Sequence, residues 1–232
     1  MDLPRLGYRR SPYCIFSPPN EEGTFQNLVR VVPDGPVSSF LAGLEEGDVI
    51  SFRGPSGRSM IPRENDKDLI LLATGVDLGP FNSLVQFLLA HGFSRPIRLF
   101  WGFRFVEDIC LLDELEQVAT NYPNFSYGIS LSQPPQDWQG LRGRLTESVP
   151  PLLETLRDKH FYLCSNGAMI AEMARSLSDL GVPKYLIYEE YFFNCKHKPD
   201  EETITQLRRR FVADDLFSPL AGLQAMLSRS RV

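Results

Sequence analysis

Two short segments rich in glycine and small residues have the composition of phosphate-binding turns. One is Ala73–Pro80 (Ala-Thr-Gly-Val-Asp-Leu-Gly-Pro), and the other is Cys164–Met169 (Cys-Ser-Asn-Gly-Ala-Met). Each follows an apolar run and opens a stretch with helical periodicity, and the free N–H groups at a helix N-terminus attract anions. Two such turns at one edge of a sheet would form a dinucleotide cleft. Glycine and proline also occur in ordinary loops, so the pattern leaves both interpretations open.

The apolar runs after residue 68 predict the elements that would position these turns. Five buried strands are expected, at residues 69–73, 97–102, 125–130, 160–164 and 185–188. Helices are expected between them, with Pro80 in the first turn of one and the others at 108–120, 146–156 and 167–180. Such alternation predicts an α/β fold with a five-stranded doubly wound parallel sheet. Ligands of these sheets bind at the carboxyl ends of the strands, where both turns fall.

The residues before position 62 have a different pattern, which is rich in β-strand signals. Three strands are expected, at residues 13–17, 25–32 and 49–53, with a short helix at 37–44. Residues 195–232 are polar and hold helix candidates at 200–211 and 219–229. The sequence therefore predicts a short antiparallel, barrel-like β-domain over 1–62, an α/β domain over 63–194 and a helical tail over 195–232.

Composition and charge exclude several classes of protein. The 232 residues carry a net charge of −5, which argues against nucleic-acid binding because that needs clustered Lys and Arg. The four cysteines have no CxxC spacing, so a zinc or iron–sulfur site is not expected. No apolar run is long enough to cross a bilayer, and no signal peptide is visible, so a cytoplasmic location with free thiols is expected.

Several motifs occur in an order that is more specific than any one of them. In chain order they are Pro12–Ser17 (Pro-Tyr-Cys-Ile-Phe-Ser), Gly35-Pro-Val-Ser38, Ala73-Thr-Gly75 through Pro80, Gly102-Phe-Arg104 with Asp108, Trp138-Gln-Gly140, and Cys164 through Met169. This succession closely resembles the ferredoxin–NADP reductase superfamily over residues 8–193. The resemblance implies a β-barrel that holds FAD and an α/β domain that holds NADH or NADPH. It further implies hydride transfer to the flavin and electron transfer to a ferredoxin, a flavodoxin or an oxygenase component.

The resemblance assigns candidate FAD-binding residues in the first part of the chain. Tyr13 matches the aromatic residue that packs on the flavin ring, and Cys14 matches a small residue beside flavin N5. Ser38 matches a residue that helps to hold the FAD pyrophosphate, and Arg10 and Ser17 fall in the same site. Without the resemblance, Tyr13 is an ordinary half-buried strand residue and Ser38 an ordinary helix cap.

The nucleotide side has its own candidates. Thr74 and Gly75 match the phosphate loop, and Cys164 matches a cysteine beside the nicotinamide, although on composition alone it is an inert core thiol. Ser130 and Met169 complete the expected cofactor contacts, although Met169 is also suited to packing under its own helix. Tyr13, Cys14 and Cys164 are the expected catalytic residues, because hydride transfer between two rings requires no nucleophile or general base.

Four features depart from the family pattern. Ser11 stands where an arginine usually pairs with the FAD pyrophosphate, so Arg10 can substitute only if residues 11–12 form a bulge. Asp77 places a carboxyl group in the phosphate loop. Leu131 stands where NADP-preferring members carry an arginine, which predicts NADH as the donor. The three expected strands are fewer than the six of the family barrel, so a missing N-terminal part, a second chain or the tail would cover the open edge.

Two functions follow. The first is an FAD-dependent oxidoreductase that passes hydride from NAD(P)H to flavin and then electrons to a carrier. The alternative is a degenerate, non-catalytic reductase-like domain that acts as an interaction subunit. An unrelated phosphate-loop enzyme is disfavoured because neither GxxxxGK[ST] nor a nucleophile-elbow motif is present.

Overall fold

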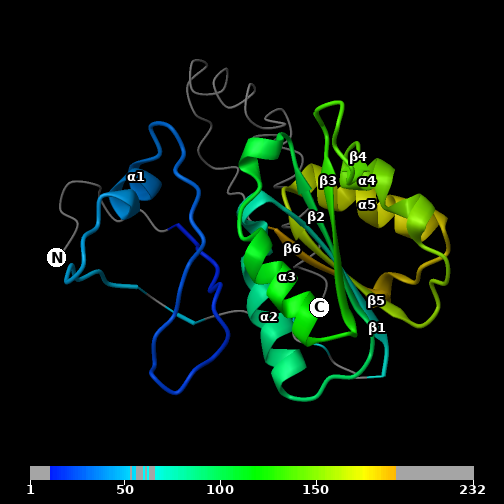
Figure 1. Ribbon diagram of the computed structural model, residues 1–232, viewed down its shortest axis with the longest axis horizontal. Coiled ribbons are helices and arrows are strands. Elements are labelled where there is room, and N and C mark those ends of the chain that lie inside the picture. Colours follow the sequence, from blue (N-terminus) through cyan, green and yellow to red (C-terminus); the bar gives the residue numbers. More distant parts are fainter. Residues whose placement is uncertain (1–10, 53, 56–59, 61, 63–65, 192–232) are drawn as a thin grey trace.

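The second part of the chain forms one parallel β-sheet flanked by helices (Figure 1). The computed structural model describes residues 11–52, 54–55, 60, 62 and 66–191. Within them the sheet has six strands in the order β4-β3-β2-β1-β5-β6, all paired in parallel. The strands are β1 (Asp68–Thr74), β2 (Ile97–Phe103), β3 (Phe125–Leu131), β4 (Leu141–Arg142), β5 (Lys159–Ser165) and β6 (Ile187–Tyr191). The order reverses at β1, which lies between β2 and β5.

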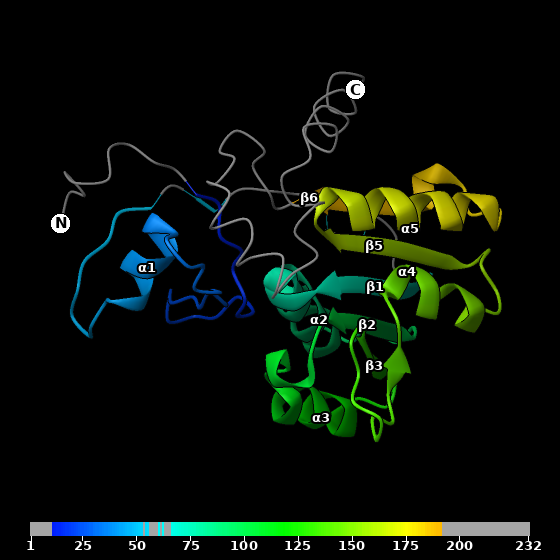
Figure 2. The same cartoon turned by 90° about the horizontal axis from the view of Figure 1, so that it is seen from above.

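Helices cover both faces of this sheet (Figure 2). The α-helices are α1 (Pro36–Ala42), α2 (Gly79–Ala90), α3 (Leu112–Asn121), α4 (Leu145–Ser148) and α5 (Gly167–Asp179). Helices α2 and α3 pack on one face, and α4 and α5 pack on the other. A hydrophobic core lies on each face of the sheet. Alternate side chains of β1 pack into one core or the other, because successive strand side chains point to opposite faces. Leu69 and Leu71 join the first core, and Ile70 and Leu72 join the second.

The sequence predicted most of this domain. Its five expected strands match β1, β2, β3, β5 and β6, and Pro80 lies in the first turn of α2 as expected. The two-residue strand β4 at the edge was not predicted, because a segment so short carries no periodicity. The helix expected over 146–156 is wrong. Helix α4 ends at Ser148, and a 3₁₀ turn (Pro150–Leu152) follows, since Pro150 and Pro151 have no N–H to donate.

The antiparallel barrel expected from the first part of the chain is not formed by the described residues. Residues 11–52 contain α1, close to the expected helix at 37–44, but no β-strand at 13–17, 25–32 or 49–52. Hydrogen bonds join the first two of these segments: the Phe16 N–H donates to the Gln26 carbonyl at 2.7 Å, the Gln26 N–H donates to Ser17 Oγ at 3.0 Å, and Asn27 Nδ2 donates to the Cys14 carbonyl at 2.6 Å. A strand is defined by ladder bonds to a neighbour, so β-propensity alone does not make one. The tail helices expected after residue 195 lie outside the described residues.

None of the helices in the described segments is both long enough and apolar enough to span a lipid bilayer.

Candidate active site

The carboxyl ends of β1 and β5 meet at the switch point of the sheet and carry the first group of candidate residues. Ala73 pairs with Cys164 in the strand register, and the hydroxyls of Thr74 and Ser165 are hydrogen-bonded to each other. Gly75 then turns the chain with φ +52°, a left-handed conformation that favours glycine. Its carbonyl accepts a 2.7 Å hydrogen bond from Trp101 Nε1 on β2. The shape of the turn is therefore fixed from three neighbouring strands.

Two helices begin at this edge, as the pattern of turns predicted. After a 3₁₀ turn (Gly75–Leu78), α2 starts at Gly79, while α5 starts at Gly167 behind β5. Asn166 caps α5, since its Oδ1 accepts a hydrogen bond from the Met169 N–H at 3.0 Å. Helix N-termini favour anions, so the arrangement can hold the phosphates of a nucleotide.

The segment that carries Tyr13 and Cys14 lies against the first turn of α2. A Cβ placed on Gly79 would lie 3.1 Å from the Cβ of Cys14, so the two backbones approach closely. Asn82 Nδ2 donates to the Phe16 carbonyl at 2.9 Å, and Asn27 Nδ2 donates to the Cys14 carbonyl at 2.6 Å. The Asn82 bond and the approach at Gly79 bring Cys14 to the same sheet edge as Cys164, from a position 150 residues away in the chain.

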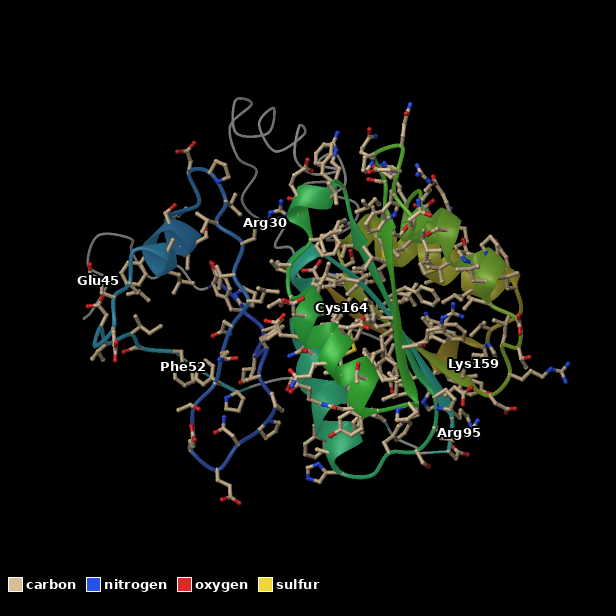
Figure 3. All side chains as sticks on the ribbon, viewed as in Figure 1. Arg30, Glu45, Phe52, Arg95, Lys159 and Cys164 are labelled. Atoms are coloured by element: carbon tan, nitrogen blue, oxygen red, sulfur yellow. The ribbon has the colours of Figure 1, made fainter. Side chains whose placement is uncertain are left out.

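An ion pair provides a second link between the two parts of the chain. Arg30 Nη2 lies 2.7 Å from Asp108 Oδ1, and their side chains are 27% and 22% exposed. Figure 3 shows Arg30 between the N-terminal segment and the α/β domain, while Glu45 lies on the outer side. Arg95 and Lys159, which pair with Asp68, lie at the opposite, amino end of β1.

We expect Arg30 and Asp108 to be energetically coupled by about 0.5–1 kcal/mol, as for partly exposed pairs elsewhere. A double-mutant cycle of Arg30→Ala and Asp108→Ala, read by denaturant unfolding, measures the coupling, which should decrease with added salt. The matched control is the Lys67–Asp66 pair, which is 3.6 Å apart with Asp66 71% exposed and should show almost no coupling. Equal coupling in both pairs would contradict this link between the two parts.

Burial shifts the pKa values of three groups at the junction, by which we mean the place where the segment around Cys14 meets the carboxyl ends of β1 and β5. Asp77 is 6% exposed, and desolvation raises the pKa of its carboxyl to about 8, against a smaller lowering by the Thr74 hydroxyl, which donates to Asp77 Oδ2 at 3.3 Å. Burial also raises the pKa of Cys14 to about 12, with smaller contributions from the charges of Asp77 and Glu190. The pKa of Cys164 is raised well above its usual range by the same causes and by Cys14. At neutral pH the junction therefore holds two thiols and a mostly protonated carboxyl.

The structure brings together Cys14, Thr74, Gly75 and Cys164, which the sequence placed in one site. Tyr13 immediately precedes Cys14 in the chain and is 37% exposed, so part of its side chain is open to contact. Partial burial raises the pKa of its hydroxyl. Arg10 lies outside the described residues.

The three serine hydroxyls that the sequence predicts as cofactor contacts all have hydrogen-bond partners within the protein, and their contacts with a cofactor stay predictions. Ser17 Oγ accepts from the Gln26 N–H, and Ser38 Oγ accepts from the Val32 N–H at 3.0 Å, so both hold turns of the N-terminal segment. Ser130 is buried, with its Oγ 2.8 Å from the Gly143 carbonyl and 2.9 Å from Ser148 Oγ. Ser130 thus braces the connection between β3 and α4.

The surroundings of Met169 and Leu131 bear on two further expectations from the sequence. The Met169 side chain packs against the core on the α5 side, which supports packing rather than a cofactor contact. Leu131 is fully buried in the core on the α2 side. The Leu131 side chain therefore offers no charged group to a 2′-phosphate, and the expected preference for NADH stays a prediction.

Several site residues were missed because their signal is purely tertiary. Arg30, Asn82 and Glu190 belong to no motif, and each takes part through a contact or a charge from a distant segment. Asp77 was noticed as a departure from the family pattern, but its burial and raised pKa could not be read from its place in the sequence. The sequence around an asparagine in the first turn of a helix does not predict that its side chain will bind another segment.

Comparison with known proteins identifies both parts of the chain. Residues 6–61 match the family described as "Oxidoreductase FAD-binding domain", and residues 71–175 match "Oxidoreductase NAD-binding domain". Among solved structures, a ferredoxin NADP+ reductase from Neisseria gonorrhoeae with bound FAD and NADP superposes with a TM-score of 0.66 at 22% identity, over 78% of this chain and 79% of that one. A cytochrome P450 reductase from Amycolatopsis superposes with a TM-score of 0.69 at 23% identity, over 81% and 58%. These likenesses confirm the fold.

Curated relatives extend the comparison to the sequence. The toluate 1,2-dioxygenase electron transfer component of Pseudomonas putida is 30% identical over 178 residues, which are 76% of this chain and 52% of the relative. The chain thus spans about half the length of that component. Ferredoxin–NADP reductase B of Sorangium cellulosum is 30% identical over 195 residues, which are 80% of this chain and 79% of the relative. With both domain families matched in order and a full-length reductase matched over most of its length, the chain belongs to the ferredoxin–NADP reductase superfamily.

Proposed function

We propose that this protein is a flavin-dependent NAD(P)H oxidoreductase whose reaction takes place between Cys14 and Cys164. The observation that carries the proposal is that these two residues, from different parts of the chain, meet beside the phosphate-binding turns of β1 and β5. FAD would lie on the N-terminal side with its ring against Tyr13, and the dinucleotide on the α/β side. We propose domain limits of 1–62, 63–194 and 195–232, as expected from the sequence.

The described residues fit a dinucleotide at this edge. A Cβ on Gly75 would have a single neighbour within 4 Å, Arg30 Nη1 at 3.8 Å, so the turn leaves room above its backbone. Asp77, which the sequence placed in the phosphate loop, is turned into the protein and is mostly neutral at pH 7. The Coulomb repulsion that a surface carboxylate would exert on a pyrophosphate is therefore largely absent.

The side chains at the junction position the reactants and exclude water. Cys14 and Cys164 are compact, and burial keeps both as neutral thiols, so neither places a charge beside an approaching ring. A flavin held at Tyr13 and Cys14 would supply the capacity to take up hydride and release electrons singly. The chain contributes close approach, which is worth much of the rate in reactions between two held partners.

The electron acceptor is proposed from the relatives. One is an electron transfer component of a dioxygenase, another is a ferredoxin–NADP reductase, and the phenol hydroxylase P5 protein of Acinetobacter pittii is 30% identical over 187 residues. A ferredoxin-like carrier, a flavodoxin or an oxygenase component fits this range. A cytoplasmic location is proposed as well, since the three described cysteines are free thiols.

The visible spectrum tests the proposal directly. Protein reconstituted with FAD should show the bands of oxidised flavin, and anaerobic NADH should bleach them. The variant Cys164→Ala should retain flavin but bleach about tenfold more slowly or worse, because the nicotinamide loses its positioning contact. Cys110→Ala is the matched control, as Cys110 is also a free thiol and packs against the first core. Protein that takes up no FAD would overturn the proposed activity.

We predict that NADH is preferred over NADPH. The loop that follows β3, residues 132–139, contains no Lys or Arg, and Arg142 donates to the Gln136 and Trp138 carbonyls at 2.7 and 2.8 Å. Without a guanidinium group in the loop, the 2′-phosphate gains no charge-assisted bonds there. Steady-state kcat/KM should be roughly tenfold higher for NADH. A higher value for NADPH would contradict this prediction.

A second candidate function is favoured by exposed apolar side chains of the N-terminal segment. Phe25 and Phe52 form an edge-to-face pair 5.0 Å apart and stay exposed together with Val31, Val49 and Ile50. Exposed apolar groups of this kind often mark contact with another polypeptide. A colourless protein that binds no FAD would support the reading as a non-catalytic interaction subunit.

A further inference from the structure

Asp77 is a buried acid at the point where the two parts of the chain meet. It lies in the 3₁₀ turn between β1 and α2, where its Oδ2 accepts a hydrogen bond from Thr74 Oγ1, which is also bonded to Ser165. These hydrogen bonds hold the Asp77 side chain where the C-terminal ends of β1 and β5 lie side by side. Through Thr74 and Ser165 the carboxyl is linked to the residue that follows Cys164 on β5, and Cys14 approaches the chain at Gly79, two residues after Asp77.

Among the described residues, the charged and titratable groups named at this edge come from the N-terminal segment and from two strands. Cys14 belongs to the N-terminal segment, Cys164 to β5 and Glu190 to β6, and the charge of Glu190 acts on the same two thiols. Arg30 reaches the turn at Gly75, where its Nη1 is 3.8 Å from the Cβ position, and its guanidinium is paired with Asp108. Apart from Arg30, the named groups are acids or thiols. A cation placed near Cys164 would therefore favour ionisation of Asp77.

Nicotinamide dinucleotides differ in charge between their two redox states. The oxidised ring carries a positive charge, and the reduced ring is neutral, while the pyrophosphate is the same in both. The protonation state of an ionisable residue beside the nicotinamide ring can therefore depend on whether the ring is oxidised or reduced.

We propose that Asp77 lets the site distinguish oxidised from reduced nicotinamide, by ionising when the cationic ring lies beside Cys164 and remaining a neutral acid when the reduced ring lies there. This inference rests on the proposed function, because it needs a nicotinamide at Cys164. In the step itself the Asp77 O–H bond breaks, one proton passes to water, and the carboxylate stays beside the cation. No electron moves and no bond to the ligand forms.

The proposal has a measurable thermodynamic consequence. Binding of NAD+ should release up to one proton at pH 7, because the free protein holds Asp77 mostly protonated. The affinity for NAD+ relative to NADH should then increase by up to about tenfold per pH unit below pH 8. The ratio of the two affinities cancels the effects of groups that respond only to the shared pyrophosphate.

Calorimetric titration of the FAD-loaded protein in two buffers of different ionisation enthalpy tests this. The analogue 1,4,5,6-tetrahydro-NAD takes the place of NADH in every binding measurement, because its ring is also neutral but cannot transfer hydride to the flavin. NAD+ should release close to one proton and the neutral analogue almost none. In Asp77→Asn both should bind without a difference in proton release, whereas the exposed control Asp113→Asn should behave like the parent protein. A pH series of the NAD+/NADH affinity ratio in the parent protein gives the same information without any variant.

The outcomes distinguish a failure of the proposed role of Asp77 from a failure of the proposed oxidoreductase function. Equal proton release with both dinucleotides, or release that persists in Asp77→Asn, would overturn the role of Asp77 and leave the proposed oxidoreductase function intact. Failure to bind either dinucleotide would overturn the proposed function and the role of Asp77 with it. A flavin that is bleached by NADH shows that the proposed function holds, whatever the proton count.

Discussion

Replacement of Asp77 by Asn is expected to stabilise the protein by several kcal/mol at pH 8 and to change little near pH 4. The cause is the raised pKa of the buried carboxyl, about 8 in the folded protein against about 3.9 for an aspartate in an unfolded chain. Below about pH 4 the group is protonated in both the folded and the unfolded chain. As the pH rises from there, the unfolded chain releases the proton while the folded protein retains it, so stability is lost until the pH passes 8.

The size of this effect follows from the shift. Each pKa unit corresponds to about 1.4 kcal/mol, so the cost at pH 8 is on the order of 5 kcal/mol. Asparagine has nearly the same shape as a protonated aspartic acid and can still accept from Thr74, but it cannot ionise. Urea unfolding at several pH values measures the difference between variant and parent.

The control for this prediction is Asp113→Asn, which removes an exposed carboxyl on α3 and should shift stability little at any pH. A difference between Asp77→Asn and the parent that is the same at pH 4 and pH 8 would show that Asp77 is not a buried neutral acid.

Gly79→Val is expected to reduce the rate of flavin reduction by about a hundredfold while leaving the α/β domain folded. A Cβ at position 79 would already lie 3.1 Å from the Cβ of Cys14 and 3.9 Å from its carbonyl, and valine adds two further methyl groups. The segment around Cys14 must then move away from α2. A displacement of about 1 Å between reacting partners is enough to cost two orders of magnitude in rate.

Two measurements check this prediction. Anaerobic stopped-flow mixing with NADH gives the rate of flavin bleaching, and the labelling rate of Cys14 by a thiol reagent reports its exposure without any flavin. Both should change in Gly79→Val. Gly43→Ala is the control, since a Cβ at Gly43 meets its nearest neighbour at an ordinary 3.6 Å. Unchanged bleaching and labelling in Gly79→Val would contradict the close approach of Cys14 to α2.

Burial on both faces explains why the central strands could be predicted. A parallel strand covered by helices on both sides reads as a continuous apolar run, and Leu69–Ala73 in β1 is such a run. The segments at 13–17 and 25–32 have similar composition but lack a continuous set of strand partners, and they form no β-strand. Composition reports that a segment can form a strand, whereas its neighbours decide whether it does.

The candidate site divides in the same way. The sequence by itself determined which turns follow which strands, and because parallel strands end at one edge of the sheet, Thr74, Gly75 and Cys164 had to lie close together. Only the tertiary structure decided that Cys14 joins them, that Arg30 pairs with Asp108 across 78 positions, and that Asp77 is buried and mostly neutral. The physical reason is the separation along the chain over which each effect acts. Hydrophobic periodicity acts over a few residues, but desolvation and close contact depend on which distant segments cover a group, and the local sequence does not carry that information.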